Sequence, residues 1–390
     1  MELADSPTSS VKTCFYFSRY APDRSPTDPY VGLPRFLAHN LRLIGFWGDS
    51  IRPVEFSNHC KTIVRIGDSV WRFPFSVLRA ITQTWRDRPD FVISCVDDSS
   101  VALGWIVSVV ARCPFYIAVE DPPFTSRYSE PMSLIKKMEK HIRTVFLHHA
   151  LSSCTTIFSF VGKSAYAEFL TPNSRILALK NGASDEALVR LESATQNKMR
   201  PSHNGDFTLG YVGAIDEEQG IPELLDAMAI AISSHDKIRL SLIGDIDKSF
   251  NLAEALAARH LEANVTVTGW VSYGEMLNHL SKCDAGCYTR RPSRWAEAAY
   301  PLKVCEYLGL ARPVVSWDYP GCRAMLGDGK YGELVMQGNV HSLASSLLRL
   351  ADPDVRRNYR AAITHDIAVL SARHSYEQIL KQVISPLSIN

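Results

Sequence analysis

Short, apolar, β-rich runs alternate with longer segments of helical period along almost the whole chain. The runs are nearly continuous in apolar residues, which is typical of parallel strands covered on both faces. The order strand, helix, strand therefore predicts an α/β fold built on doubly wound parallel sheets. The first expected helix covers residues 31–45. The predicted strands of the first half are Thr13–Phe17, Thr62–Ile66, Phe91–Val96, Phe115–Val119, Thr156–Phe160 and Arg175–Lys180.

The alternation is interrupted once, by a polar stretch with Pro and Gly at residues 193–206. Such a stretch is typical of a linker, and 390 residues exceed one ordinary hydrophobic core. A second series of strands begins at Phe207. We therefore predict two doubly wound domains that face a cleft, because ligands of such sheets bind outside the carboxyl ends of the strands. The predicted bounds are residues 11–190, a linker at 191–205, a second domain at 206–373, and a terminal helix at 374–387 that packs back onto the first domain.

Composition excludes several classes of protein. The net charge of +1 argues against a nucleic-acid binder. The nine cysteines form no CxxC pair, which indicates a reducing, cytoplasmic compartment without a disulfide framework. The N-terminus lacks the pattern of a signal peptide. The most apolar stretch, Val101–Val119, is split by Arg112 and Pro114 and is shorter than the roughly 20 residues of a membrane span. Peripheral membrane contact through a helix face stays open.

Two motifs carry candidate chemistry. In FTLGYVGAIDEEQGIPELLDAM a strand ends at Gly213 and a helix begins near Ile221. Glycine lets a backbone approach a ligand closely, and a helix start favours a phosphate. The alternative is an ordinary turn between a strand and a helix.

The second motif is YPLKVCEYLGLARPVVSW, in which Lys303 and Glu306 share a face at the start of a helix. A carboxylate can accept two hydrogen bonds from a ribose diol, and an ammonium suits a diphosphate. The alternative is a solvated ion pair on the surface of a helix.

In this order, these two motifs and VTVTGWVSYGEMLNHLSKCDAG between them resemble the nucleotide-binding half of GT-B glycosyltransferases, of the retaining, glycogen-synthase-like group that builds bacterial surface glycans and glycolipids. The resemblance covers almost the whole chain and is strongest in Phe207–Trp317. It implies two Rossmann-like domains, with acceptor binding in the first and nucleotide-sugar binding in the second. It implies that Glu306 holds the ribose and Lys303 the diphosphate, and that Asn181 and Gly182 mark the hinge side. The implied donor site comprises Gly213, Ala214, Gly244, Gly269, Trp270, Val271, Arg290, Tyr300, Pro301, Leu302, Lys303 and Glu306, and the candidate catalytic residues are Asp121, Glu297 and Lys303.

The chain departs from the family pattern at three places. Ala214 and Gln219 stand where the family commonly has basic residues, so that the available cations are Lys303, Arg290 and Arg291. Ala298 stands where the family has a glutamate, with Glu297 one position earlier. Asp121 follows the fourth predicted strand, where the family often has a histidine; it could accept a proton or cap the turn at Pro122–Pro123.

The sequence gives no reason to expect a cofactor or a metal. The DID at residues 245–247 superficially matches a metal-binding DxD, but the resemblance implies that protein donors hold the diphosphate. The function expected is a retaining transfer from a nucleotide sugar to a hydroxyl of a glycan or lipid-linked saccharide, in the cytoplasm or at the inner face of a membrane. The alternatives are another nucleotide-sugar enzyme on the same fold, such as an epimerase or hydrolase, a degenerate subunit that binds a partner, and a small-molecule binding protein.

Overall fold

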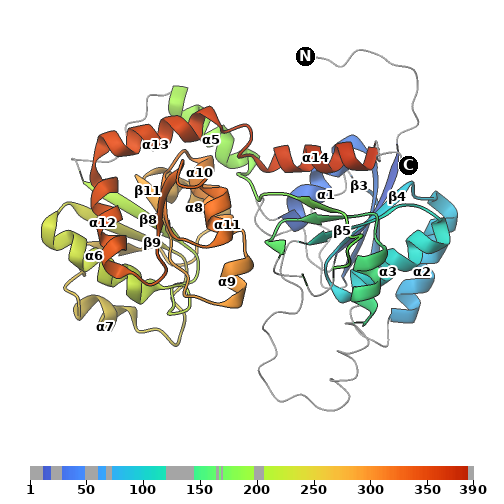
Figure 1. Ribbon diagram of the computed structural model, residues 1–390, viewed down its shortest axis with the longest axis horizontal. Coiled ribbons are helices and arrows are strands. Elements are labelled where there is room, and N and C mark those ends of the chain that lie inside the picture. Colours follow the sequence, from blue (N-terminus) through green and yellow to red (C-terminus); the bar gives the residue numbers. More distant parts are fainter. Residues whose placement is uncertain are drawn as a thin grey trace. The chain divides into compact units, whose positions relative to one another are not determined.

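The structure, a computed structural model, describes residues 12–18, 29–48, 60–66, 73–119, 145–163, 167, 170–196 and 206–384. The chain divides into two compact units (Figure 1). Unit 1 comprises residues 1–179 and 376–390, and unit 2 comprises residues 180–375. The predicted α/β class is confirmed, because each unit is a parallel sheet with interleaved helices.

Unit 1 contains a seven-stranded sheet in the order β3-β2-β1-β4-β5-β6-β7. All its pairings are parallel, and the buried strands are rich in β-branched and aromatic residues, which suits a sheet covered on both faces. Its elements are β1 (Thr13–Ser18), α1 (Pro29–Asn40), β2 (Arg42–Gly48), β3 (Cys60–Ile66), α2 (Phe73–Asp87), β4 (Phe91–Cys95), α3 (Asp98–Ala111), β5 (Phe115–Val119), β6 (Thr156–Ser159) and β7 (Ile176–Ala178).

The helix predicted over residues 31–45 is wrong in its second part. Helix α1 ends at Asn40, and the chain continues as strand β2, which pairs in parallel with β1. The apolar run at residues 41–47 fits helical and strand periods equally well, so that local pattern cannot separate them. Pairing with β1 on one side and β3 on the other decides for the strand.

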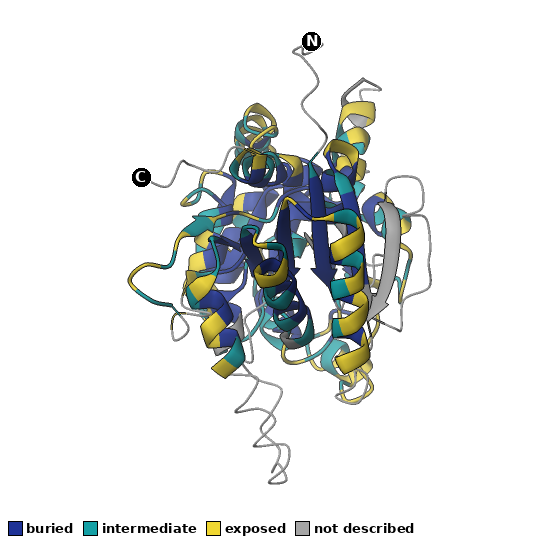
Figure 2. Cartoon of the chain, turned by 90° about the vertical axis from the view of Figure 1, so that its right-hand side faces the viewer, coloured by how far each residue is buried: buried dark blue, intermediate teal, exposed yellow. Residues whose placement is uncertain are grey.

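Unit 2 contains a six-stranded parallel sheet in the order β10-β9-β8-β11-β12-β13. The central strands of this sheet are mostly buried, whereas the surrounding helices carry exposed residues on their outer faces. The same contrast between central strands and helices holds in unit 1 (Figure 2). Its elements are α5 (Asp185–Gln196), β8 (Phe207–Val212), α6 (Ile221–Ser234), β9 (Ile238–Ile243), α7 (Leu252–Ala257), β10 (Val265–Val267), α8 (Tyr273–Ser281), β11 (Ala285–Tyr288), α9 (Arg294–Ala298), α10 (Leu302–Gly309), β12 (Val314–Trp317), α11 (Pro320–Met325), β13 (Gly332–Val335), α12 (Val340–Ala351), α13 (Pro353–His365) and, shared with unit 1, α14 (Ala372–Ile384).

The unit boundary differs from the predicted domain boundary. Unit 2 begins at Lys180 rather than after residue 190. Two backbone hydrogen bonds explain the difference, because Ala183 donates to Leu370 and accepts from Ala372 within unit 2. Helix α5 runs to Gln196, through the first six residues of the predicted linker, and the other linker residues, 197–205, lie outside the described residues. The predicted terminal helix 374–387 is observed as α14, which begins two residues earlier.

Candidate active site

The sheet of unit 2 reverses its winding between β8 and β11. The chain leaves β8 toward β9 on one side and leaves β11 toward β12 on the other. Paired registers join β8 to β11 only at Leu209–Ala285 and Gly210–Gly286. Such a reversal point opens a crevice at the carboxyl ends of the strands, which is where ligands of doubly wound sheets bind.

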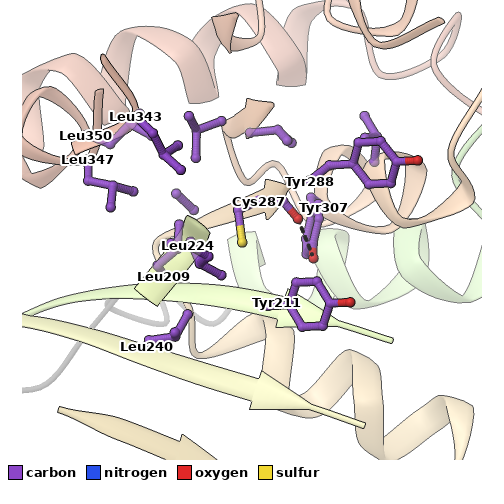
Figure 3. Close-up of a cluster of buried hydrophobic side chains, with 14 of the residues drawn as sticks. Leu209, Tyr211, Leu224, Leu240, Cys287, Tyr288, Tyr307, Leu343, Leu347 and Leu350 are labelled. Carbon is purple, nitrogen blue, oxygen red and sulfur yellow. Dashed lines mark hydrogen bonds between the residues drawn. The ribbon is translucent and has the colours of Figure 1, made fainter. Parts of the chain in front are cut away.

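The hydroxyl of Tyr307 joins the two strands where their own ladder stops. It accepts a hydrogen bond from the Val212 N–H at 3.0 Å and donates one to the Cys287 carbonyl at 3.2 Å (Figure 3). The ring fits because position 286 is glycine; a Cβ there would lie 2.2 Å from Cγ of Tyr307. This bridge fixes helix α10, which carries Tyr307, against the reversal point.

Gly213 follows β8 directly and has a φ of +128°, a conformation that side chains disfavour. A Cβ at this position would lie 2.5 Å from Nζ of Lys303. The predicted neighbourhood of Gly213 and Lys303 is therefore present in the structure. Ala214 follows, and its carbonyl accepts a hydrogen bond from the hydroxyl of Tyr211 at 2.6 Å.

The ammonium of Lys303 lies among neutral groups. It donates to Oε1 of Gln219 at 2.7 Å and to Oη of Tyr211 at 3.2 Å. Although the residue as a whole is only partly buried, loss of hydration of its ammonium, and next the charge of Arg290, lowers the pKa of Lys303 to about 8. The site therefore concentrates positive charge that a bound anion would stabilise.

Glu306 lies one turn after Lys303 and is only 4% exposed. Its Oε2 accepts a hydrogen bond from Oη of Tyr273 at 2.8 Å, and that hydroxyl lies 2.7 Å from Oγ of Ser184. Burial, and next the Glu306 carboxylate, raises the pKa of Tyr273 well above its ordinary range. The alternative of a solvated ion pair on a helix surface is wrong, because the carboxylate is buried and held in place.

The two arginines after β11, Arg290 and Arg291, pair with glutamates of the segment that joins β8 to α6 and of the first turn of α6. Arg290 forms an ion pair with Glu218. Arg291 donates to Glu223 at 2.7 Å and to Glu217 at 3.0 Å. The loop between β8 and α6 and the first turn of α6 therefore supply the carboxylates, and the cations come from the segment after β11 and from α10.

The predicted base-binding loop has a defined backbone. Gly244 has a φ of +146°, and a Cβ there would lie 2.1 Å from the Gly213 carbonyl oxygen. Gly269 forms a bridge with Gly244, and the Trp270 N–H donates to Oδ1 of Asp245 at 2.8 Å. The indole of Trp270 is 73% exposed, and the adjoining Val271 packs partly against the core.

The remaining predicted residues lie around the start of α10. Tyr300 accepts a hydrogen bond at its carbonyl from Nδ2 of Asn181 at 2.7 Å, and Pro301 is the N-cap residue that precedes Leu302. Glu297 is exposed on the short helix α9, whereas Ala298 is buried. Among the described residues, the structure shows no hydrogen bond or ion pair between the side chain of Glu297 and a residue of the proposed donor site. Asp121 lies outside the described residues.

The DID loop has structural hydrogen bonds. Asp245 holds the Trp270 N–H, and Asp247 accepts from the backbone N–H and the hydroxyl of Ser249 at 2.8 and 2.6 Å. Those bonds lower the pKa of Asp247. Within the described ranges, no group of three or more His, Cys, Asp and Glu could hold a metal ion. No helix in that part of the chain is long and apolar enough to cross a membrane.

The sequence did not identify four residues of the site, and it marked a fifth only as a difference from the family pattern. Tyr211, Tyr273, Ser184 and the acidic residue Glu218 carry no local mark of a ligand site. Gln219 stands where the family commonly has a basic residue, and only the structure shows that its side chain accepts a hydrogen bond from Lys303.

Comparison with known proteins identifies the class of unit 2. Residues 193–365 match the family model of the group 1 glycosyl transferases. The chain is 22% identical over 258 residues to an alpha-D-kanosaminyltransferase of Streptomyces kanamyceticus, and the matched part covers 65% of each protein. It is 19% identical over 290 residues, or 72% of each protein, to the capsular polysaccharide biosynthesis glycosyltransferase CapM of Staphylococcus aureus.

A solved structure, Anabaena Alr3699/HepE in complex with UDP, matches 96% of this chain and 100% of its own, with a TM-score of 0.68 and 14% sequence identity. A likeness at this identity shows the fold, and the fold is GT-B.

Proposed function

We propose that this chain, which carries a group 1 glycosyl transferase domain on a GT-B fold, moves a sugar from a nucleoside-diphosphate sugar to a hydroxyl of a glycan or lipid-linked saccharide with retention of configuration. The observation that carries the proposal is the position of the Lys303 ammonium, within 2.5 Å of where a Cβ of Gly213 would lie. The backbone of Gly213, which has no side chain, and the poorly hydrated ammonium of Lys303 lie side by side at the reversal point of the sheet.

The leaving diphosphate is the group that needs most stabilisation in such a transfer, because negative charge grows on it as the glycosidic bond breaks. Lys303 and the neighbouring Arg290 supply the positive charge in this proposal. Burial, and next repulsion from Arg290, lowers the pKa of Lys303, and the negative charge of a bound diphosphate would oppose both effects. Arg290 is paired with Glu218, so a donor diphosphate would compete with this carboxylate for the guanidinium.

Glu306 is suited to the ribose diol. Its carboxylate is fixed by Tyr273 at 2.8 Å, and a fixed carboxylate can accept two hydroxyl hydrogen bonds without losing side-chain entropy on binding. Trp270 and Val271 would lie beside the base, with the backbone of the loop held by Asp245.

In the proposed retaining step, the acceptor hydroxyl attacks the anomeric carbon on the face from which the diphosphate departs. The bond from the acceptor oxygen to that carbon forms, the bond to the phosphate oxygen breaks, and the departing phosphate oxygen takes the acceptor proton. No carboxylate nucleophile is needed, so Ala298 is compatible with the reaction. The UDP complex of the HepE structure supports the donor class, and the name of the capsular polysaccharide biosynthesis glycosyltransferase CapM supports the acceptor class. The proposed place of action is the cytoplasmic side of a membrane.

The test begins with thermal unfolding of the whole protein with uridine, guanosine, adenosine and cytidine diphosphates and their sugars, without added metal. A nucleotide that binds raises the melting temperature by mass action. We expect one base to stabilise the protein and Glu306→Ala to reduce that shift at the same nucleotide concentration. Product analysis with and without an acceptor then separates transfer from hydrolysis or epimerisation.

Three residues favour a second candidate, a non-catalytic partner subunit, because Ala214, Gln219 and Ala298 replace residues that the family pattern commonly has. Tight nucleotide binding without turnover on any acceptor, or a folded protein that no nucleotide stabilises, would replace the transferase proposal with this one. A transferase that depends on Lys303 should instead lose turnover more than binding in Lys303→Ala.

A further inference from the structure

Ser184 lies near the start of unit 2, directly before helix α5. Its hydroxyl oxygen accepts a hydrogen bond from the Ala187 N–H at 3.1 Å, which is the geometry of a helix N-cap. The same oxygen lies 2.7 Å from Oη of Tyr273, and Ser184 is only 3% exposed. Ser184 therefore has two hydrogen-bond partners inside unit 2, and only the first of them belongs to α5.

The carboxylate of Glu306 fixes the direction of the hydrogen bonds that lead to it. A carboxylate only accepts, so Tyr273 donates its hydroxyl proton to Oε2 of Glu306, at 2.8 Å. Burial, and next the charge of Glu306, raises the pKa of Tyr273 well above its ordinary range, so that this proton stays in place. Because a tyrosine hydroxyl has one proton, Oη of Tyr273 accepts at its other contact, and Ser184 donates there. The hydrogen bonds thus run in one direction, from the backbone of α5 through Ser184 and Tyr273 to Glu306.

Close packing holds helix α10, which carries Glu306, against the start of α5. A Cβ at Gly309 of α10 would lie 2.6 Å from Cβ of Ala183 and 3.0 Å from Cβ of Ala187. Glycine allows the two backbones to approach this closely. The separation between Ser184 and Glu306 is therefore set by packed backbone, and the hydrogen bonds between them have one geometry.

We propose that Ser184 is a positioning residue of the donor site, which acts through Tyr273 on Glu306 and thereby sets the preference of the site for a ribose with free hydroxyl groups. Hydrogen bonds in a row polarise one another, so the bond from Ser184 strengthens the bond from Tyr273 to Glu306. A carboxylate held in this way can accept from ribose hydroxyls without a further loss of side-chain entropy. The proposal rests on the proposed function, in which Glu306 binds the ribose.

The alternative is that Ser184 only caps helix α5. Loss of a cap destabilises the fold, but it gives no reason for a nucleotide with ribose hydroxyls to be affected more than a nucleotide without them. Asn339→Ala is a matched control, because the side chain of Asn339 caps helix α12 by accepting from the Ser342 N–H at 2.9 Å. It removes a cap at a helix that carries no residue of the proposed donor site.

The experiment measures, by titration calorimetry on the full chain, the affinity for two ligands. One is the nucleoside diphosphate that stabilises the protein most among the four bases, and the other is the 2′,3′-dideoxy analogue of that nucleotide. The wild-type protein should bind the analogue about tenfold or more weakly, because the analogue lacks the hydroxyls that would donate to Glu306.

Ser184→Ala should lower the affinity for the ribose nucleotide by about twofold to fivefold and leave the affinity for the analogue unchanged. Ser184→Thr keeps a hydroxyl and should restore most of the preference. Tyr273→Phe keeps the cap of α5 and should reduce the preference at least as much as Ser184→Ala does. Adding Ser184→Ala to Tyr273→Phe should cause no further loss, because the first residue acts through the second. Asn339→Ala should lower the melting temperature and keep both affinities.

An unchanged preference in both Ser184→Ala and Tyr273→Phe would overturn the proposal, and so would an equal loss of affinity for the two nucleotides. A further loss in the double variant would also contradict it, because Ser184 would then act without Tyr273. A wild-type protein that binds no nucleoside diphosphate, or that binds both ligands equally, would overturn the proposed role of Glu306 and the proposal together. A preference that is present in the wild type and independent of Ser184 would overturn the proposal alone.

Discussion

Nζ of Lys303 donates a hydrogen bond of 2.7 Å to Oε1 of Gln219, and this bond joins helix α10 to the loop before α6. The side chains are 84 positions apart in the chain. The bond shows how this site differs from the family pattern described above, because the loop contributes a neutral amide and the cation comes from α10. The chemistry of the proposed donor site therefore depends on one lysine and on the groups that lower its pKa.

The affinity for a nucleoside diphosphate should fall as the pH rises above about 8. The pKa of Lys303 is lowered to about 8 by loss of hydration and by Arg290, so Lys303 in the free site is charged below that pH and neutral above it. A diphosphate needs the charged form, and the affinity should drop up to tenfold for each further pH unit. Titration calorimetry between pH 6.5 and 9.5 would measure this.

In Lys303→Met the affinity for a nucleoside diphosphate should be low at every pH, and it should no longer fall as the pH rises above about 8. Lys330→Met is the control, because Lys330 pairs with Asp366 and has no part in the proposed site. The same pH dependence in Lys303→Met as in the wild type would assign the titration to another group.

Glu306→Ala should weaken nucleotide binding by about 1–3 kcal/mol, which is the cost of losing hydrogen bonds to a charged group. Tyr273→Phe removes only the hydrogen bond that fixes the carboxylate, and it should cost less, about 0.5–1.5 kcal/mol. Calorimetry at neutral pH would give both values.

Glu333→Ala is a matched control for Glu306→Ala. Glu333 also accepts a hydrogen bond from a tyrosine, Tyr359, at 2.8 Å, but it lies on β13. Its substitution should leave nucleotide affinity unchanged. Wild-type affinity in Glu306→Ala would remove Glu306 from the donor site.

Gly213→Ala should lower kcat/KM by about tenfold to a hundredfold, because a displaced catalytic group costs on this order. The new methyl group would lie 2.5 Å from Nζ of Lys303 and would move it, in a backbone conformation with φ of +128° that alanine disfavours. Steady-state kinetics together with thermal unfolding would separate the two effects.

Gly338→Ala isolates the backbone strain. Gly338 has a φ of +72° and no atom within 4 Å of a built Cβ. This variant should lose about 1–2 kcal/mol of stability and keep its activity. Equal loss of activity in the two variants would show that the displaced lysine is not the cause.

Tyr307→Phe should lower the free energy of unfolding by about 2–6 kcal/mol. The change leaves the Val212 N–H and the Cys287 carbonyl without their bridge inside the core, and each unpaired buried group costs about 1–3 kcal/mol. Urea unfolding would measure the difference.

Tyr288→Phe is the contrasting variant on the neighbouring strand. The Tyr288 hydroxyl is buried and has no hydrogen-bond partner in the described part of the chain. Its removal should be neutral or slightly stabilising, because an unpaired buried hydroxyl is unfavourable. Comparable destabilisation by the two substitutions would contradict the role given to the Tyr307 bridge.

The amino-acid sequence was enough to predict the α/β class, the two series of parallel strands, the position of Gly213 directly after its strand, and a shared helix for Lys303 and Glu306. These features depend on periodicity and on residue types within a dozen positions, which local conformational preferences can express. The same local information was insufficient at residues 41–47, where the pattern suits a helix and a strand equally and pairing with β1 decides.

The contacts of the site residues, and the choice of which apolar side chains stay exposed, depend on the tertiary structure. Lys303 meets Tyr211 and Gln219, and Glu306 meets Tyr273, across 33 to 92 positions of chain. Such contacts form because the packed sheet brings the carboxyl ends of β8 and β11 and the start of α10 together. In α2 the packing reversed the expected pattern, since Ser76, Ala80 and Thr84 are inside and Phe75, Leu78 and Trp85 outside. A sequence states which side chains are apolar, and only packing against the rest of the chain determines which of them are buried.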